Sequence, residues 1–250
     1  MASNLDSNVE RIFDSLRSHG LLDDSLVLVV SDNGGEASAG SSNYPLRGEK
    51  FTYFEGGIRV PAAVVNLPGE GRKVSPRIAT MSDILPTILD AASVPIPSGV
   101  EGQSLLDVTE CTDEDSRLTV LLDPVYSCGA VFSSQYKLVV NGTCGYDEIL
   151  QKPSLGGWSK PGDADDNEPE VPLHSPEISL FDVSVDPYER HDLSFDESLA
   201  PLLRDLLDAF QSRKSEALHM ERQSKAPGLP LSEITPRPPN YKIRPIAANY

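Results

Sequence analysis

The sequence lacks several features that would assign the chain to a large class of proteins. It has no apolar run close to the roughly 18 residues that a membrane span needs, and its first residues, MASNLDSNVERIF, show neither the basic nor the apolar segment of a secretion signal. Basic residues are few, since 21 Lys and Arg stand against 38 Asp and Glu, a formal net charge of −17. Such a field repels phosphate backbones, so we expect no nucleic-acid partner. Because no long apolar run is present, we also expect no membrane span.

Cysteine is also scarce, with Cys111, Cys128 and Cys144 in 250 residues. No Cys-x-x-Cys pair occurs, which excludes a zinc ribbon. The remaining composition, 39% hydrophobic and 24% charged, is that of a globular chain with room for one large domain or for a domain and a smaller partner. Asn141 begins an Asn-Gly-Thr sequon, a glycosylation candidate if the chain is secreted.

The first third of the chain has the rhythm of an α/β layer. Apolar residues at i, i+3, i+4 and i+7 from Val9 predict a helix that ends before Gly20. The continuous apolar run from Leu26 to Val30 predicts a strand buried on both faces. A second strand is expected near residues 60–65, and MSDILPTILDAA predicts a helix.

The character of the sequence changes near residue 110, at the acidic stretch TECTDEDSR. The stretches LTVLLD, AVFSSQYKLVV and ISLFDVSVD then predict short strands, and apolar residues from Leu199 to Phe210 predict an amphipathic helix. We therefore expect an α/β domain over 1–115, a small α+β subdomain of antiparallel sheet and helix over 116–225, and an extended proline-containing tail over 226–250.

Two polar residues, Asp32 and Asn33, directly follow the first predicted strand. Ligands of open α/β sheets gather at the carboxyl ends of strands, and these side chains offer the oxygen atoms that Ca²⁺ and Mg²⁺ prefer. The alternative is a simple turn, because Asp-Asn-Gly-Gly is favourable turn chemistry. Two side chains do not fill a Ca²⁺ shell of about six to eight ligands, so from these residues alone the turn is the simpler interpretation.

The segment PLRGEKFTYFEGGIRVP follows in a glycine-rich stretch. Lys50 within it could hold an oxyanion as a compact point charge, or it could be a solvated surface lysine. Gly56 and Gly57 are expected to serve backbone geometry rather than catalysis. Arg59 is expected to pair with an acidic neighbour such as Glu55.

Taken together and in this order, LVLVVSDNGG, NYPLRGEKFTYFEGGIRVP and SDILPTILDAA resemble the sulfatase family of the alkaline-phosphatase-like superfamily, and most closely its arylsulfatase B-like branch. YKLVVNGTCGY and LFDVSVDPYERHDLS resemble the C-terminal region of that branch. The resemblance covers only the C-terminal half of such a protein, which implies a partial alkaline-phosphatase-like sheet layer in an α/β fold. It also implies that Asp32 and Asn33 are ligands of one Ca²⁺ (or Mg²⁺) per complete site, and that Lys50 contacts the sulfate group of a sulfate ester.

The nucleophile of that family is missing from this chain. Sulfatases carry Cys-x-Pro-x-Arg, and none of the contexts CTDED, CGAVF and CGYDE fits it, nor does any serine version appear. We therefore expect no catalytic residue here, and a sulfuric ester hydrolase homologue whose isolated chain has no turnover, because no covalent step is available. The alternative is a non-catalytic sulfatase-like protein that binds an anion or a partner.

The resemblance also extends to the cysteines and to the surroundings of the chain. It implies a Cys128–Cys144 disulfide in an oxidising compartment, with two free thiols as the alternative, and leaves Cys111 free. Trp158 is expected to be buried. The family is usually lysosomal or secreted, yet no signal is visible, so the compartment stays unknown. A partial sheet exposes an edge and apolar surface, so we expect a marginally stable chain unless the missing N-terminal half or an oligomer partner covers it.

Overall fold

The computed structural model describes residues 2–65, 78–106, 117–146, 156–158 and 177–224. The chain divides into two compact units, one formed by residues 1–30, 62–115 and 236–250 and the other by residues 31–61 and 116–235. Residues 31–61 thus group with the C-terminal part of the chain, and not with the sequence that flanks them. The expected boundary near residue 115 and the tail 226–250 lie outside the described residues, so the domain ranges stay a prediction.

The first unit contains the helices and strands that the N-terminal pattern predicts. They are α1 (Ala2–Ser18), β1 (Val27–Val30), β2 (Ala62–Val65), the 3₁₀ turn η2 (Met81–Asp83) and α3 (Ile84–Ala91). β1 and β2 pair antiparallel, with Val27 opposite Val65. The buried Asp83 carboxylate accepts hydrogen bonds from the N–H groups of Thr80 (2.7 Å) and Gln103 (2.8 Å). The first belongs to a capping box at the start of η2, and the second ties the segment that follows α3 back to this turn.

The expectation that the first strand is buried on both faces is wrong. Only the first half of β1 is partly buried, and Val29 and Val30 are 41% and 37% exposed. Within the described residues, β1 belongs to a sheet of two strands, and so small a sheet offers other segments little face to pack on.

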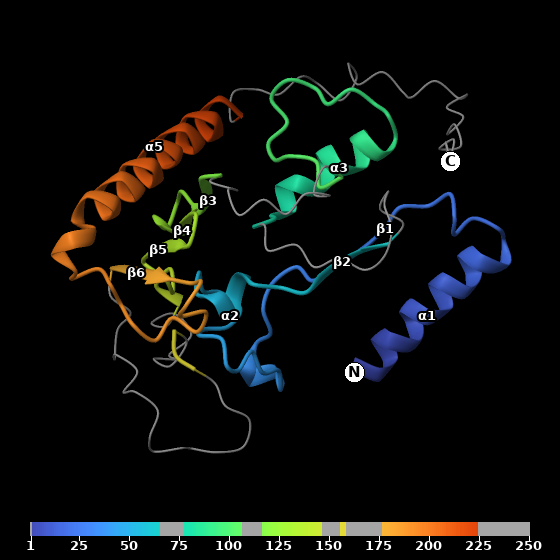
Figure 1. The fold of residues 1–250 in the computed structure, drawn as a ribbon, viewed down its shortest axis with the longest axis horizontal. Helices are drawn as coiled ribbons and strands as arrows, with labels where there is room; N and C mark the ends of the chain where they lie inside the picture. Colours follow the sequence, from blue (N-terminus) through green and yellow to red (C-terminus); the bar gives the residue numbers. More distant parts are fainter. Residues whose placement is uncertain (1, 66–77, 107–116, 147–155, 159–176, 225–250) are drawn as a thin grey trace. The chain divides into compact units, whose positions relative to one another are not determined.

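The second unit is built on a four-stranded antiparallel sheet in the order β3-β4-β5-β6 (Figure 1). Its elements are η1 (Ala37–Ala39), α2 (Glu55–Ile58), β3 (Thr119–Asp123), β4 (Cys128–Ser133), β5 (Tyr136–Val140), β6 (Ile178–Asp182), η3 (Glu197–Leu199) and α5 (Ala200–Ser224). The mixed α/β character with antiparallel strands and a C-terminal helix is as the sequence predicts. Within the part of the chain that the structure describes, no helix is long and apolar enough to cross a membrane.

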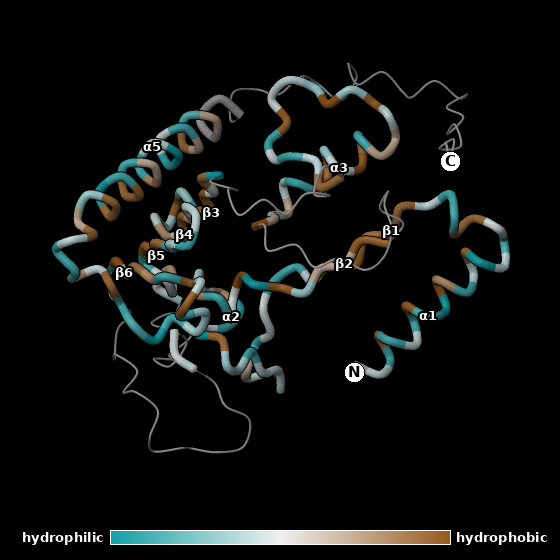
Figure 2. Tube along the Cα trace, viewed as in Figure 1, coloured by the Kyte–Doolittle hydropathy of each residue, from teal (hydrophilic) through white to brown (hydrophobic). Residues whose placement is uncertain are grey.

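Both faces of this sheet are covered, by different segments. On one face, Val131, Leu138 and Leu180 lie opposite one another in register and pack against Leu206 and Phe210 of α5. Figure 2 shows apolar and polar residues alternating along α5, as one buried helix face requires.

The opposite face of the same sheet carries the alternate residues of each strand. Val139 and Phe181 pack there against Phe54, which is 0% exposed and belongs to the loop just before α2. This contact explains why residues 31–61 belong to the second unit, and it sets the candidate site on the sheet.

Candidate functional site

The stretch after β1 forms a tight polar turn. Asn33 donates its backbone N–H to Asp32 Oδ1 at 2.9 Å, and Ser31 Oγ donates to the carbonyl of Asn33 at 3.1 Å. Asp32 is exposed and Asn33 is partly buried. The turn chemistry that the sequence offers is therefore used, and it leaves a carboxylate at the surface.

This turn is held directly against the loop that carries Lys50. Gly34 donates its N–H to the carbonyl of Gly57 at 2.8 Å, and Lys50 donates its N–H to the carbonyl of Gly35 at 3.2 Å. A Cβ at Gly34 would lie 1.7 Å from the carbonyl oxygen of Gly56. The glycines serve backbone geometry here, and the structure brings together the two segments that the sequence singled out.

Two polar side chains that sequence reasoning did not assign hold the inside of this loop. Asn43 Oδ1 accepts the N–H of Gly35 at 2.8 Å while its Nδ2 donates to the carbonyl of Gly35, also at 2.8 Å. The carboxylate of Glu49, which is 1% exposed, accepts the N–H of Ala37. Polar residues inside a glycine-rich stretch were the available signal, because the backbone N–H groups of a loop need such partners.

Arg47 is a second basic residue of the loop, and it is buried. Its guanidinium lies 3.9 Å from the centre of the Phe54 ring, and its Nε donates to the carbonyl of Gly156 at 2.6 Å. Burial lowers the pKa of Arg47, and nearby carboxylates, Glu189 foremost, oppose this shift. Arg47 thus joins the loop to a distant part of the chain and does not face solvent.

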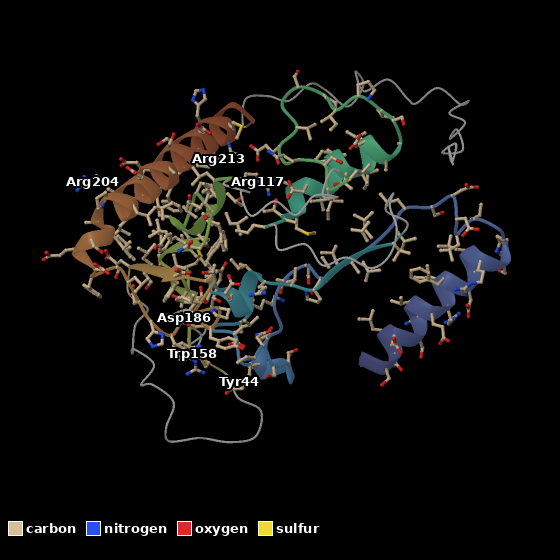
Figure 3. The ribbon with its side chains drawn as sticks, in the orientation of Figure 1. Tyr44, Arg117, Trp158, Asp186, Arg204 and Arg213 are labelled. Carbon is tan, nitrogen blue, oxygen red and sulfur yellow. A yellow bond between two sulfur atoms is a disulfide. The ribbon has the colours of Figure 1, made fainter. Side chains whose placement is uncertain are left out.

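Trp158, which is labelled in Figure 3, also contacts Arg47, and its ring centre lies 5.1 Å from that guanidinium. Its indole N–H donates to the carbonyl of Tyr188 at 2.8 Å. Trp158 is only partly buried, so the expected burial is met in part, and its polar edge meets a backbone carbonyl.

A buried cluster of charges lies below α2. Lys137 of β5 is 0% exposed, and its Nζ lies 2.8 Å from Glu55 Oε1 and 2.7 Å from Glu189 Oε1. The other oxygen of Glu189 accepts the backbone N–H of Glu55 at 2.7 Å. Arg59 also pairs with Glu55, at 3.5 Å, as the sequence predicts, although Lys137 is the closer partner. Burial raises the pKa of Glu189, and Lys137 opposes that rise.

The candidate metal ligands match a hard cation in type but not in number. Asp32 and Asn33 supply oxygen donors suited to Ca²⁺ or Mg²⁺. Among the described residues, no group of three or more His, Cys, Asp or Glu side chains is placed to hold a metal ion. These residues therefore offer at most part of a site, and no catalytic step through a metal is derived for this chain.

The remaining predicted positions lie around the end of β5. Cys128 and Cys144 are joined by a disulfide, with their Cα atoms 5.3 Å apart, whereas Cys111 lies outside the described residues. Asn141 is partly buried, and Thr143 of its sequon is 2% exposed. Glycosylation at Asn141 stays a prediction.

Comparison with known proteins identifies relatives of this chain. The family model described as Sulfatase matches residues 1–94. Arylsulfatase J of Mus musculus is 30% identical over 78% of this chain and 36% of its own length, and arylsulfatase A of Homo sapiens is 28% identical over 76% and 37%. The chain therefore spans little more than a third of these curated relatives.

A solved structure shows the likeness of fold. A sulfatase from a Pseudoalteromonas species superposes with a TM-score of 0.54 at 17% identity, over 84% of this chain and 42% of that one. At this identity the match shows the fold alone, which is the alkaline-phosphatase-like fold of the sulfatases. With the family model and the arylsulfatase relatives, it shows that this chain belongs to the sulfatase family.

Proposed function

We propose that this chain supplies part of the sulfate-ester site of a sulfuric ester hydrolase of the arylsulfatase kind. The observation that supports it is the hydrogen bond from Lys50 N–H to the carbonyl of Gly35, which sets the Lys50 loop beside the Asp32–Asn33 turn. In this proposal Asp32 and Asn33 hold one Ca²⁺ or Mg²⁺ together with ligands from elsewhere, and the Lys50 ammonium neutralises sulfate oxygens. The cation would act as a Lewis acid on the sulfate.

The isolated chain is proposed to be inactive. The sequence holds no Cys-x-Pro-x-Arg, so the family's nucleophile for attack at sulfur is missing from this chain. The absence of this motif also favours a second candidate, a non-catalytic sulfatase-like protein that binds an anion. Turnover would then need the rest of a longer sulfatase chain or an oligomer partner. By its relatives, such a protein belongs in a lysosomal or secreted compartment.

The binding half of the proposal is tested by calorimetric titration of the purified chain with CaCl₂ and with inorganic sulfate. We expect weak Ca²⁺ binding that is lost in Asp32→Ala and unchanged in Asp24→Ala. Asp24 is the control because it is an exposed carboxylate that precedes β1 in the sequence, whereas Asp32 follows it. We expect sulfate binding that Lys50→Ala weakens at least about tenfold while Lys214→Ala, on α5, leaves it unchanged. Sulfate binding that ignores Lys50 would overturn the assignment of the loop.

The catalytic half is tested on an aryl sulfate with Ca²⁺ present. We expect no hydrolysis above the uncatalysed rate. Hydrolysis that Lys50→Ala abolishes would contradict the inactivity of the isolated chain, because it would require a nucleophile within these 250 residues.

A further inference from the structure

Three sequence motifs that the proposed function leaves without a role meet at one place in the fold. EGGIR contributes Glu55, YKLVV contributes Lys137, and DPYER contributes Glu189. Glu55 lies 82 positions from Lys137 and 134 positions from Glu189 in the sequence, yet the three residues form the buried cluster described above. We name them the Glu–Lys–Glu cluster.

The cluster connects the candidate site to the C-terminal sheet by a short series of contacts. Lys137 lies in β5 on the face that packs against Phe54, and Glu189 follows β6 at φ +57°. The carboxylate of Glu189 receives the first N–H of α2, at Glu55. Two residues later, the carbonyl of Gly57 receives the N–H of Gly34.

The burial of this cluster argues against an accidental pairing. Lys137 is 0% exposed and Glu189 is 1% exposed, so both charges have left water, and an ion in that position is costly unless it is paired. Apolar residues of similar size would pack as well at lower cost, whereas fixed charges impose one geometry on the backbone that they hold. The geometry of the cluster fits a role in fixing α2 on the sheet.

We propose that the Glu–Lys–Glu cluster is the positioning network of the candidate site: it fixes α2 on β5 and thereby sets the turn of Asp32 and Asn33 and the loop of Lys50. That the positioned residues form a sulfate-ester site rests on the proposed function. Its test uses backbone amide exchange, which needs no cation, sulfate or turnover. The positioning can therefore fail while the proposed function stands, and the reverse holds too.

The first experiment measures residue-resolved amide exchange of the full chain by NMR, in the wild type and in Lys137→Met. The variant leaves two buried carboxylates without their cation, so at pH 7.5 we expect protection of the Glu55, Gly34 and Lys50 amides to fall about tenfold or more. Burial already raises the pKa of Glu189 and Lys137 opposes it, so losing Lys137 moves this pKa further up. The measurement is repeated at pH 5, where a larger protonated fraction of Glu189 should restore part of the protection.

A matched control separates this effect from a plain loss of packing. Val139→Ala removes apolar contact from the same strand and the same face, at a residue 1% exposed. It should lower protection of strand and loop together, with the same loss at both pH values. If Lys137→Met behaves like Val139→Ala, the cluster is ordinary core and the proposal is overturned.

Other charged side chains surround the cluster. Arg59 lies 3.5 Å from Glu55, and Arg47 interacts with Glu189 and then, in decreasing order, with Asp192 and Asp186. His191 Nδ1 lies 3.6 Å from Asp186 Oδ2. The pH comparison is therefore repeated with His191→Gln added, and recovery of protection that disappears in that background contradicts the role of Glu189.

A second variant, Glu189→Gln, covers the case in which Lys137→Met does not fold. It keeps an oxygen acceptor for the Glu55 N–H and leaves Lys137 paired with Glu55 one to one. The charged acceptor is lost, so protection of the Glu55 amide should fall severalfold, and protection of the Gly34 amide should fall by a similar factor. An unchanged Gly34 amide beside a weakened Glu55 amide overturns the connection between the cluster and the turn.

Discussion

Glycines decide the geometry of the candidate site at the scale of single residues. A Cβ at Gly34 would lie 1.7 Å from the carbonyl oxygen of Gly56, one at Gly56 would lie 2.2 Å from that of Gly48, and one at Gly57 would lie 2.2 Å from that of Thr52. Three backbone segments therefore meet with no room for side chains between them. This close approach allows the Gly34–Gly57 hydrogen bond and so the position of Asp32 and Asn33.

The corresponding prediction compares two glycines of the same loop. Gly34→Ala forces a Cβ against backbone and should lower the free energy of unfolding by about 3 kcal/mol. In Gly40→Ala the new Cβ has no atom within 4 Å, but the φ of +87° strains any residue with a side chain. The free energy of unfolding should therefore fall by about 1 kcal/mol. Urea unfolding followed by circular dichroism gives both values, and equal losses would contradict the close contact at Gly34.

The sequence anticipated the turn but not what the turn touches. Asp-Asn-Gly-Gly names a turn through local chemistry, and the residue types of Asp32, Asn33 and Lys50 name the ligand chemistry. Gly34 approaches the carbonyl of Gly56, and Arg47 donates to a carbonyl that lies 109 positions away. Local patterns carry no information on such contacts.

At the scale of elements, the C-terminal sheet is held by a helix on one face and by the site loop on the other. Short β-like stretches between turn signals predicted the strands, and the apolar spacing of α5 predicted the helix. The pairing of β1 with β2 alone was not predicted, because a continuous apolar run is equally compatible with a covered and an uncovered strand. The covering depends on which segments pack there.

The packing of α5 gives a prediction with a control of the same residue type. Phe210 is 0% exposed and contacts the sheet residues Val131 and Leu138, whereas Phe195 is 87% exposed. Phe210→Ala should destabilise the second unit by about 3–5 kcal/mol, and Phe195→Ala should change stability by less than about 0.5 kcal/mol. Thermal or urea unfolding measures both, and a small effect at Phe210 would show that α5 does not rest on the sheet.

At the scale of the whole molecule, the first unit exposes apolar side chains on β1 and α3. Val29 and Val30 of β1 and Leu85 and Ile88 of α3 are all more than a third exposed. The sequence predicted such a surface from the resemblance to part of a larger fold, and the chain spans little more than a third of its arylsulfatase relatives. Marginal stability of the isolated chain, and a partner that covers this surface, stay predictions.

Self-association of the purified chain tests the consequence of that surface. Leu85→Lys combined with Ile88→Lys places two charges on the exposed side of α3 and should raise the monomer fraction in light scattering after size exclusion. Val185→Lys makes a comparable change at an 81% exposed residue of the second unit, and it should have little effect. A wild-type chain that is already a monodisperse monomer with one cooperative thermal transition would contradict the expectation.

The sequence by itself determined the family and the α/β class, because short motifs and residue periods are local properties that can be read without the fold. It also determined that no nucleophile motif is present, since a motif is either written in the chain or not. Only the tertiary structure decided that the site loop rests on the C-terminal sheet, and that Glu55, Lys137 and Glu189 share one buried cluster. Such contacts join residues far apart in sequence, and they are selected by packing and by the need of buried charges to be paired.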